Sequence, residues 1–263
     1  MMVSAVACDT APGTGDVTEV RQPLTGFTFG VTNQQSFQNN YLPTLGYSNE
    51  NSQEFGNRFA EQNTWNWWYN LSFAAPFWEN SNDQDWGGND SVSLVYSYTH
   101  GFVSGTGSGS MSGWNMNEQV TWASSLNMRL GDEATQLGVW ASWACHVLYT
   151  GDGYFITRWW NAFAGGLYTI LGSQDIVYDG WTTSDTGEQL AENLNDGDVI
   201  NHAWTDAMGD WWVSNDVSVA MTGSNYTDCY WRLDNAHWPG VMSFGRYRDG
   251  SIGYFCAYEW TDL

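Results

Sequence analysis

The chain has 263 residues, of which 42% are hydrophobic and 17% aromatic, and this composition excludes a wholly disordered protein. It carries 29 acidic residues against seven arginines and no lysine, which gives a net charge of −22 and excludes DNA and RNA as expected partners, since nucleic-acid affinity needs Lys and Arg to displace counterions. Such a surface is typical of a halophilic or extracytoplasmic protein, where salt screens self-repulsion, although an ordinary acidic protein shares it.

The N-terminal residues have features of a targeting segment. Small residues precede Cys8, as at the end of a secretory signal or in a lipoprotein box, although a basic n-region and a full apolar core are missing. We therefore expect an extracellular or cell-surface protein, with a lipid anchor at Cys8 as one form of attachment. No stretch is long and apolar enough to be a transmembrane segment. Residues 1–25 predict an extended lead-in to an α/β domain over residues 26–223.

Residues 27–78 predict a strand, a helix and an aromatic cluster. Phe27–Thr32 has the β-branched and aromatic content of a first strand, and Ser52–Gln62 repeats apolar residues near helical spacing. Two aromatic runs follow at Trp65–Tyr69 and Phe73–Trp78. Such side chains can stack on a sugar or a peptide, but they also supply the largest apolar areas for core packing, and both interpretations stay open.

The segment Asn80–Asp90 alternates side chains that carry oxygen. Asp83, Asp85 and Asp90 are candidates for a structural Ca²⁺ site, because hard cations take several carboxylate and carbonyl oxygens. The segment lacks the spacing of the helix-loop-helix calcium motif, so a solvated loop is the simpler interpretation. No other cofactor is expected.

Two apolar runs, Ser91–Gly101 and Leu137–Leu148, organise the middle of the chain. Each has the composition of a buried strand and ends at a reactive side chain, His100 in the first run and Cys145 in the second. A Gly/Ser-rich loop and a crossover helix over Asn115–Leu130 are predicted between them. Parallel neighbours need such a crossover, and their carboxyl ends meet at one edge of a sheet, so His100 and Cys145 are expected to face one crevice.

This pair has the chemistry of a nucleophile and its base. A cysteine attacks as thiolate, its free pKa of about 8.5 leaves little of it ionised at neutral pH, and a nearby imidazole can take the proton. Gly101 lets a substrate carbonyl approach the backbone, so its N–H and that of Cys145 are candidate oxyanion donors. A working site predicts that Cys145 is accessible, near His100 and lowered in pKa, whereas a buried thiol favours a scaffold.

A strand that ends in His-Gly, followed by one that ends in Ala-Cys, resembles the caspase-like cysteine peptidases of clan CD, such as caspases, legumain, gingipains and clostripain. The resemblance implies a three-layer α/β fold with a mostly parallel central sheet, His100 as general base, Cys145 as nucleophile and Gly101 as oxyanion donor. A group of secreted bacterial and archaeal domains of unknown function is similar over roughly residues 27–222. Its matching segments include Gly87–Asp90, Arg129–Asp132, Cys145–Leu148, Trp160–Leu167 and Asn201–Trp204, and the chain departs from it at Thr99 and His146.

The second half of the chain alternates predicted helices and strands. Helices are expected at residues 154–171, 185–195 and 198–211, and strands at residues 173–178 and 217–222. Short strand-like pieces fill residues 224–263, which we expect to form a β-rich C-terminal extension packed on the same domain. Cys229 and Cys256 lie in this extension, where a disulfide and two buried free thiols both fit the pattern.

The sequence therefore predicts a cysteine peptidase that hydrolyses peptide or protein substrates through a thioester on Cys145, with His100 as general acid/base. Asp152 and Asp175, shortly after the later strand ends, could favour a basic substrate side chain. Zinc bound by His100, Cys145 and His146 is a rival, opposed by the opposite directions of adjacent side chains on a strand. The alternative function is a catalytically inactive scaffold that binds glycans or proteins through its 18 tryptophans.

Overall fold

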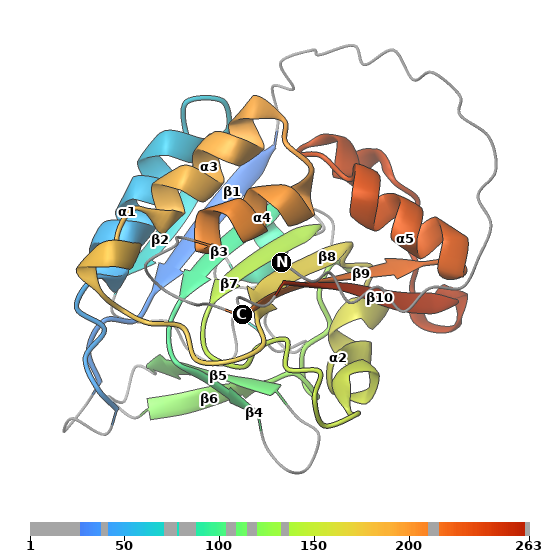
Figure 1. Cartoon of the computed structure of the whole chain (residues 1–263), viewed down its shortest axis with the longest axis horizontal. Coiled ribbons are helices and arrows are strands. Elements are labelled where there is room, and N and C mark those ends of the chain that lie inside the picture. The colour runs from blue at the N-terminus through green and yellow to red at the C-terminus, as the bar shows by residue number, and fades with distance from the viewer. Residues whose placement is uncertain are drawn as a thin grey trace.

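A seven-stranded sheet forms the centre of the molecule (Figure 1) and has the strand order β10-β9-β8-β7-β3-β1-β2. The structure is a computed structural model that describes residues 27–37, 42–70, 78, 88–103, 109–114, 120–132, 137–209 and 216–260. Neighbours from β2 to β8 are parallel, and β9 and β10 are added antiparallel. This confirms the mostly parallel α/β sheet that the sequence predicts. The strands are β1 (Thr28–Asn33), β2 (Thr64–Asn70), β3 (Leu94–Tyr98), β7 (Val139–Trp143), β8 (Thr169–Ser173), β9 (Val217–Gly223) and β10 (Tyr254–Trp260).

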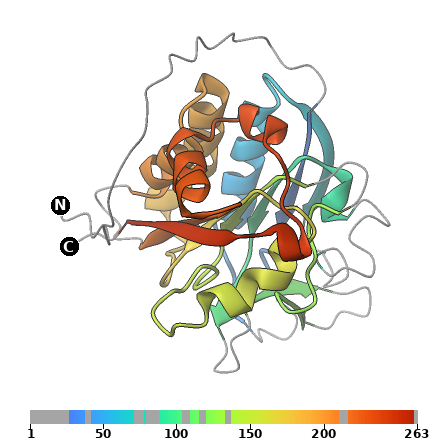
Figure 2. The same cartoon turned by 90° about the vertical axis from the view of Figure 1, so that its right-hand side faces the viewer.

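Alternate positions of these strands fill two cores, one on each face of the sheet. In β3 the side chains of Leu94 and Tyr96 belong to one core and Val95 to the other, and in β7 Val139 and Trp140 divide in the same way. Figures 1 and 2 show helices on both faces, which gives three layers. The first core is covered by α1 (Ser48–Phe59), α3 (Thr186–Asp196) and α4 (Ile200–Met208), and the second by α2 (Phe155–Ala164).

A small antiparallel sheet occupies the connection between β3 and β7, where the sequence predicted a loop and a crossover helix over Asn115–Leu130. Its strands are β4 (Gly101–Val103), β5 (Gly109–Trp114) and β6 (Val120–Ser124). The helix prediction rested on apolar residues near helical spacing, but β6 is Val-Thr-Trp-Ala-Ser, whose β-branched and aromatic residues favour a strand. The prediction was wrong in element type. A parallel pair needs a long connection, and a sheet serves as well as a helix.

The helix predicted over residues 154–171 is shorter than expected. α2 ends at Ala164, and Gly166 has a φ of +116°, a backbone conformation that glycine adopts readily and that ends the helix. β8 then begins at Thr169 and ends at Ser173, so the strand lies earlier than the predicted residues 173–178. The apolar run Leu167–Leu171 was therefore assigned to the wrong element, because short apolar runs fit a helix and a strand alike.

The C-terminal residues 224–260 are mixed rather than β-rich, which corrects the predicted extension. α5 (Tyr226–Asn235) begins where the Asn225 side chain accepts a hydrogen bond from the Asp228 backbone N–H at 3.0 Å, a standard helix start. β10 pairs with β9 and so completes the central sheet. A disulfide between Cys229 and Cys256, whose Cα atoms are 5.9 Å apart, joins α5 to β10.

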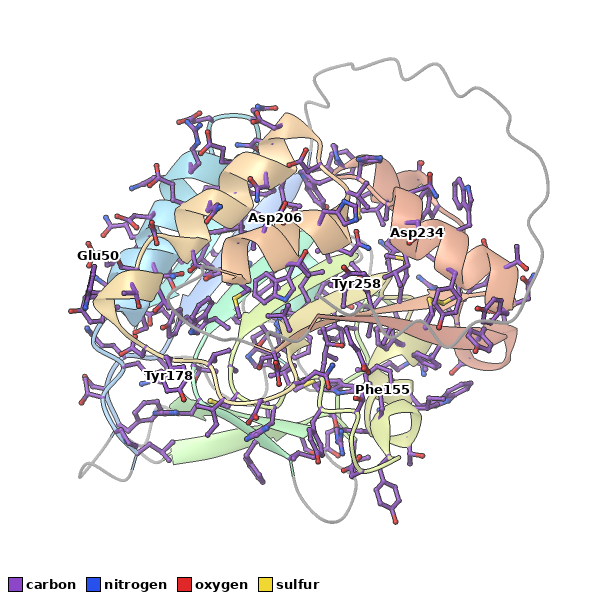
Figure 3. All side chains as sticks on the ribbon, in the orientation of Figure 1. Glu50, Phe155, Tyr178, Asp206, Asp234 and Tyr258 are labelled. Carbon is purple, nitrogen blue, oxygen red and sulfur yellow. A yellow bond between two sulfur atoms is a disulfide. The ribbon has the colours of Figure 1, made fainter. Side chains whose placement is uncertain are left out.

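Acidic side chains are exposed across the helical layers. Glu50, Asp206 and Asp234 are exposed on α1, α4 and α5 respectively, and all three are labelled in Figure 3. Within the described part of the chain, no helix is long and apolar enough to cross a membrane. The expectations for residues 1–25 with Cys8, for Phe73 to Phe77, and for Asp83 and Asp85 lie outside the described residues.

Candidate functional site

The two reactive side chains follow neighbouring parallel strands. β3 and β7 pair in a register that sets Tyr98 opposite Trp143, and the Thr99 N–H donates to the Trp143 carbonyl at 3.1 Å. His100 and Cys145 therefore each lie two residues after the last paired residue of adjacent parallel strands. The sequence prediction that these two runs are parallel neighbours is confirmed.

Gly101 brings the two strand ends into direct contact. A Cβ atom at this position would lie 2.4 Å from the Cys145 carbonyl oxygen and 3.0 Å from the Ala144 Cβ, so a larger residue does not fit. The glycine is required here for close approach of two backbones, since its φ is not in the left-handed region. The His-Gly pair thus packs on the Ala-Cys pair, and both oxyanion candidates belong to this contact.

Cys145 carries the free thiol of the described residues and is only partly exposed. Burial raises the pKa of the Cys145 thiol, and the nearby Asp175 carboxylate raises it slightly more, while hydrogen bonding with the backbone of Val177 and of Cys145 itself opposes the shift. The Sγ lies 3.9 Å from the Val177 carbonyl oxygen, a weak contact. The lowered pKa expected of a working thiol is therefore absent at rest, and the thiol is protonated at neutral pH.

The His100 ring is oriented by a backbone carbonyl. Its Nε2 lies 2.8 Å from the Pro43 oxygen, and the Phe37 ring packs against the imidazole with centroids 4.9 Å apart. A carbonyl oxygen only accepts hydrogen bonds, so Nε2 carries the proton, which in the neutral imidazole leaves the lone pair on Nδ1. Sequence reasoning named no orienting group, because any residue supplies a carbonyl and the sequence therefore gives no signal for it.

The residues after β8 contact the turn that carries Cys145. His146 donates its backbone N–H to the Asp175 carbonyl at 3.0 Å, and its Nδ1 lies 3.1 Å from the Gln174 carbonyl oxygen and 3.8 Å from the Asp175 carboxylate. Cys145 and His146 lie in a turn after β7 rather than on the strand, and His146 has a φ of +57°. The zinc interpretation finds no support, because the described residues contain no group of three or more His, Cys, Asp or Glu that could hold a metal ion.

Asp179 links three parts of this edge of the sheet, although the sequence did not single it out. Its Oδ1 accepts hydrogen bonds from the Tyr98 hydroxyl at 2.9 Å and from the Tyr47 backbone N–H at 3.1 Å. Tyr98 is the last residue of β3, and Tyr47 immediately precedes α1. Burial, and then the Asp179 charge, raise the pKa of the Tyr98 phenol well above its ordinary value, so Tyr98 remains a hydrogen-bond donor.

Asp152 and Asp175, the two carboxylates expected to favour a basic substrate, differ in their surroundings. Asp152 forms an ion pair with the buried Arg158 and also accepts the Tyr154 backbone N–H at 2.9 Å, so its charge is already neutralised. Asp175 is mostly exposed, with 62% of its side chain accessible, and lies beside His146. Only the second carboxylate therefore adds net negative charge near the thiol.

Asp90, the described member of the proposed calcium set, has a structural role. Its two carboxylate oxygens accept hydrogen bonds from the Gly131 N–H at 2.7 and 2.8 Å and from the Asp132 N–H at 3.0 Å. The segment before β3 is thereby tied to the turn that leads towards β7. Since these backbone donors already use both oxygens, Asp90 is not a free ligand.

Comparison with known proteins gives a family but no activity. A family model described as a domain of unknown function (DUF6345) matches residues 30–255, which include both strands of the site and all of its side chains named above. No curated protein matches the chain.

Proposed function

The chain belongs to the DUF6345 family of unknown function, and from this premise we propose that it is a cysteine hydrolase that cleaves peptide bonds. Cys145 is the nucleophile and His100 the general acid/base. The observation that carries the proposal is the packing of Gly101 on the Cys145 backbone, with 2.4 Å from a Cβ at Gly101 to the Cys145 oxygen. Such a contact sets an imidazole, a thiol and two backbone N–H groups on one edge of the sheet, which is the set that acyl transfer needs.

The reaction begins with a protonated thiol, because the pKa of Cys145 is raised. His100 takes the thiol proton through Nδ1 as Sγ attacks the substrate carbonyl carbon, and the carbonyl oxygen becomes an oxyanion that the Gly101 and Cys145 N–H groups stabilise. The Pro43 carbonyl, 2.8 Å from Nε2, holds the ring and stabilises the imidazolium that forms. The thiol of Cys145 therefore loses its proton only when it attacks a bound substrate.

The second half of the reaction returns the enzyme to its starting state. His100 gives its proton to the leaving amine as the C–N bond breaks, which leaves a thioester on Cys145. His100 then takes a proton from water, the hydroxide oxygen attacks the thioester carbon, and the acid product leaves as Sγ recovers the proton. No metal or cofactor enters this balance.

A second candidate function, a binding scaffold without catalysis, is favoured by the raised pKa and partial burial of the same thiol. Exposed aromatic side chains would then bind a partner, and among those that the structure describes Trp181 is the most exposed, with 77% of its surface accessible. The two candidates differ in whether His100 changes the reactivity of Cys145.

Alkylation of the native protein by iodoacetamide at graded pH, with mass mapping of each cysteine, separates the candidates. If the dyad works, Cys145 is labelled at neutral pH, and His100→Ala slows this labelling by about tenfold or more, because the local base is lost. His202→Ala, an exposed histidine on α4, is the matched control and should label like the wild type. Equal labelling rates in His100→Ala and the wild type would establish the scaffold instead.

A further inference from the structure

Asp179 belongs to the segment after β8 that also contacts the thiol of Cys145. The carbonyl oxygen of Val177 is 3.9 Å from Sγ. Asp179 follows Val177 by two residues, which span at most about 7 Å of backbone. Tyr98, which donates to the Asp179 carboxylate, is two residues before His100. The carboxylate is therefore held by a hydrogen bond from the strand that leads to His100, and it lies on a segment that contacts the thiol.

The two oxygens of this carboxylate are used unequally. Oδ1 takes both hydrogen bonds, from Tyr98 and from Tyr47, whereas Oδ2 has no donor among the described residues. A Cβ at Gly46 would lie 3.8 Å from Oδ2, an ordinary contact distance, so the glycine leaves this oxygen uncovered. An ionised carboxylate has about four acceptor positions, and at least two of them remain on the partly exposed Asp179.

The described part of the chain supplies no cation to Asp179. Each arginine that the structure describes is bound elsewhere: Arg58 to Glu61 and Glu192, Arg129 to Asp132 and Asp249, Arg158 to Asp152, Arg232 to Asp228, Arg246 to the Leu137 and Gly166 carbonyls, and Arg248 to the Gly131 carbonyl. The exposed Asp175 adds a second negative charge near the thiol. The field at this edge of the site therefore attracts a positive group.

We propose that Asp179 selects substrates with a basic side chain, arginine or lysine, on the acyl side of the scissile bond, an inference that rests on the proposed hydrolase function. Oδ2 accepts the guanidinium or ammonium group while Tyr98 and Tyr47 hold Oδ1, and this places the carbonyl of the same residue over Sγ. An apolar preference is the rival, because Tyr178, labelled in Figure 3, and Ile176 are 57% and 52% exposed on the same segment.

Three peptidyl acyloxymethyl ketones that differ only in the residue next to the reactive carbon, Arg, Met or Glu, test this choice. The rate at which each forms an adduct on Cys145 is measured by mass mapping. We expect Arg to exceed Met by about tenfold or more, the effect of one hydrogen-bonded charge pair, and Glu to be slowest. Asp179→Asn should reduce the Arg-to-Met ratio to about one, whereas Asp196→Asn, which removes one exposed charge at the end of α3, should keep it.

A Met probe that reacts as fast as the Arg probe, or an Arg preference that survives Asp179→Asn, would overturn the proposal. If Asp179→Asn does not fold, the Arg-to-Met ratio of the wild type is measured at about 0.1 M and at about 1 M salt. The Debye length falls from about 10 Å to about 3 Å between these two conditions. A preference that depends on charge must therefore be smaller at the higher salt concentration, and an unchanged ratio would overturn the proposal. A failed preference with His100-dependent iodoacetamide labelling rejects this inference alone. Loss of the His100 dependence rejects the hydrolase itself.

Discussion

Asp90 and Asp179 form hydrogen bonds at opposite ends of β3, and they use their carboxylate oxygens in different ways. Asp90 is fully buried before β3 begins, and both of its oxygens accept backbone N–H groups. Asp179 is partly exposed where β3 has ended, and its two hydrogen bonds are both on Oδ1. An aspartate thus stabilises the fold where backbone N–H groups use both of its oxygens, as at Asp90, and can bind a ligand where one oxygen has no donor among the described residues, as at Asp179.

Removal of these two carboxylates in turn should produce the largest difference in the free energy of unfolding. Asp90→Ala leaves the N–H groups of Gly131 and Asp132 without their acceptors, and we expect the free energy of unfolding to fall by about 4 kcal/mol, since each buried group left unpaired costs about 1–3 kcal/mol. Asp179→Ala should cost about 1 kcal/mol, because its surroundings are partly wet. Urea unfolding measures both, and equal losses would contradict the comparison.

The disulfide at the β10 edge is a structural link away from the thiol. It closes a loop between residues separated by 27 positions, and its loss in Cys229→Ser/Cys256→Ser should lower the free energy of unfolding by about 3 kcal/mol. Cys145 labelling in the folded double variant should match the wild type. A changed labelling rate would mean that this edge is coupled to the site.

The contact at Gly101 should connect stability and reactivity. Gly101→Ala places a Cβ 2.4 Å from the Cys145 oxygen, so we expect a loss of about 2 kcal/mol in unfolding free energy, together with loss of the effect of His100 on Cys145 labelling. Gly240→Ala is the matched control, because nothing lies within 4 Å of its Cβ position. Normal His100-dependent labelling in Gly101→Ala would show that the close contact is not needed.

The smallest expected effect concerns Asp175. Its charge helps to raise the pKa of Cys145, after the larger effect of burial, so Asp175→Asn should lower that pKa and move the alkylation profile to lower pH. Because folding raises the pKa of Cys145, the native wild type should also label more slowly at this residue than the urea-unfolded chain at the same pH. Alkylation rates across a pH series check both statements, and a shift of Asp175→Asn to higher pH would refute the assigned sign.

The sequence predicts the pairing of β3 with β7 because its signal is local. Two short runs of β-branched and aromatic residues stop at His100 and Cys145, and the rule that parallel strands end at one edge supplies the rest. The connection was predicted wrongly because the apolar residues around Val120 and Ala123 also fit a helix, and only pairing with β5 distinguishes the two.

The other groups of the site depend on tertiary structure. Pro43 acts through a carbonyl that every residue has, and Asp179 is distinguished from other aspartates only by donors from Tyr98 and Tyr47, the latter 132 positions away. Asp152 illustrates the converse, because its place after a strand suggested an available charge and Arg158 occupies it. Composition cannot separate such cases, since the contacts that decide them join distant segments.

β4 begins at Gly101, and this residue pairs with Met111 of β5. The peptide N–H of Gly101, which we propose as an oxyanion donor, is thus at the first residue of the small sheet. A ligand or an engineered cross-link that bends β4 would tilt that N–H away from the carbonyl it should polarise. If the proposed hydrolase is active, its turnover would then respond to forces applied on the small sheet, without any change in the thiol or the imidazole themselves.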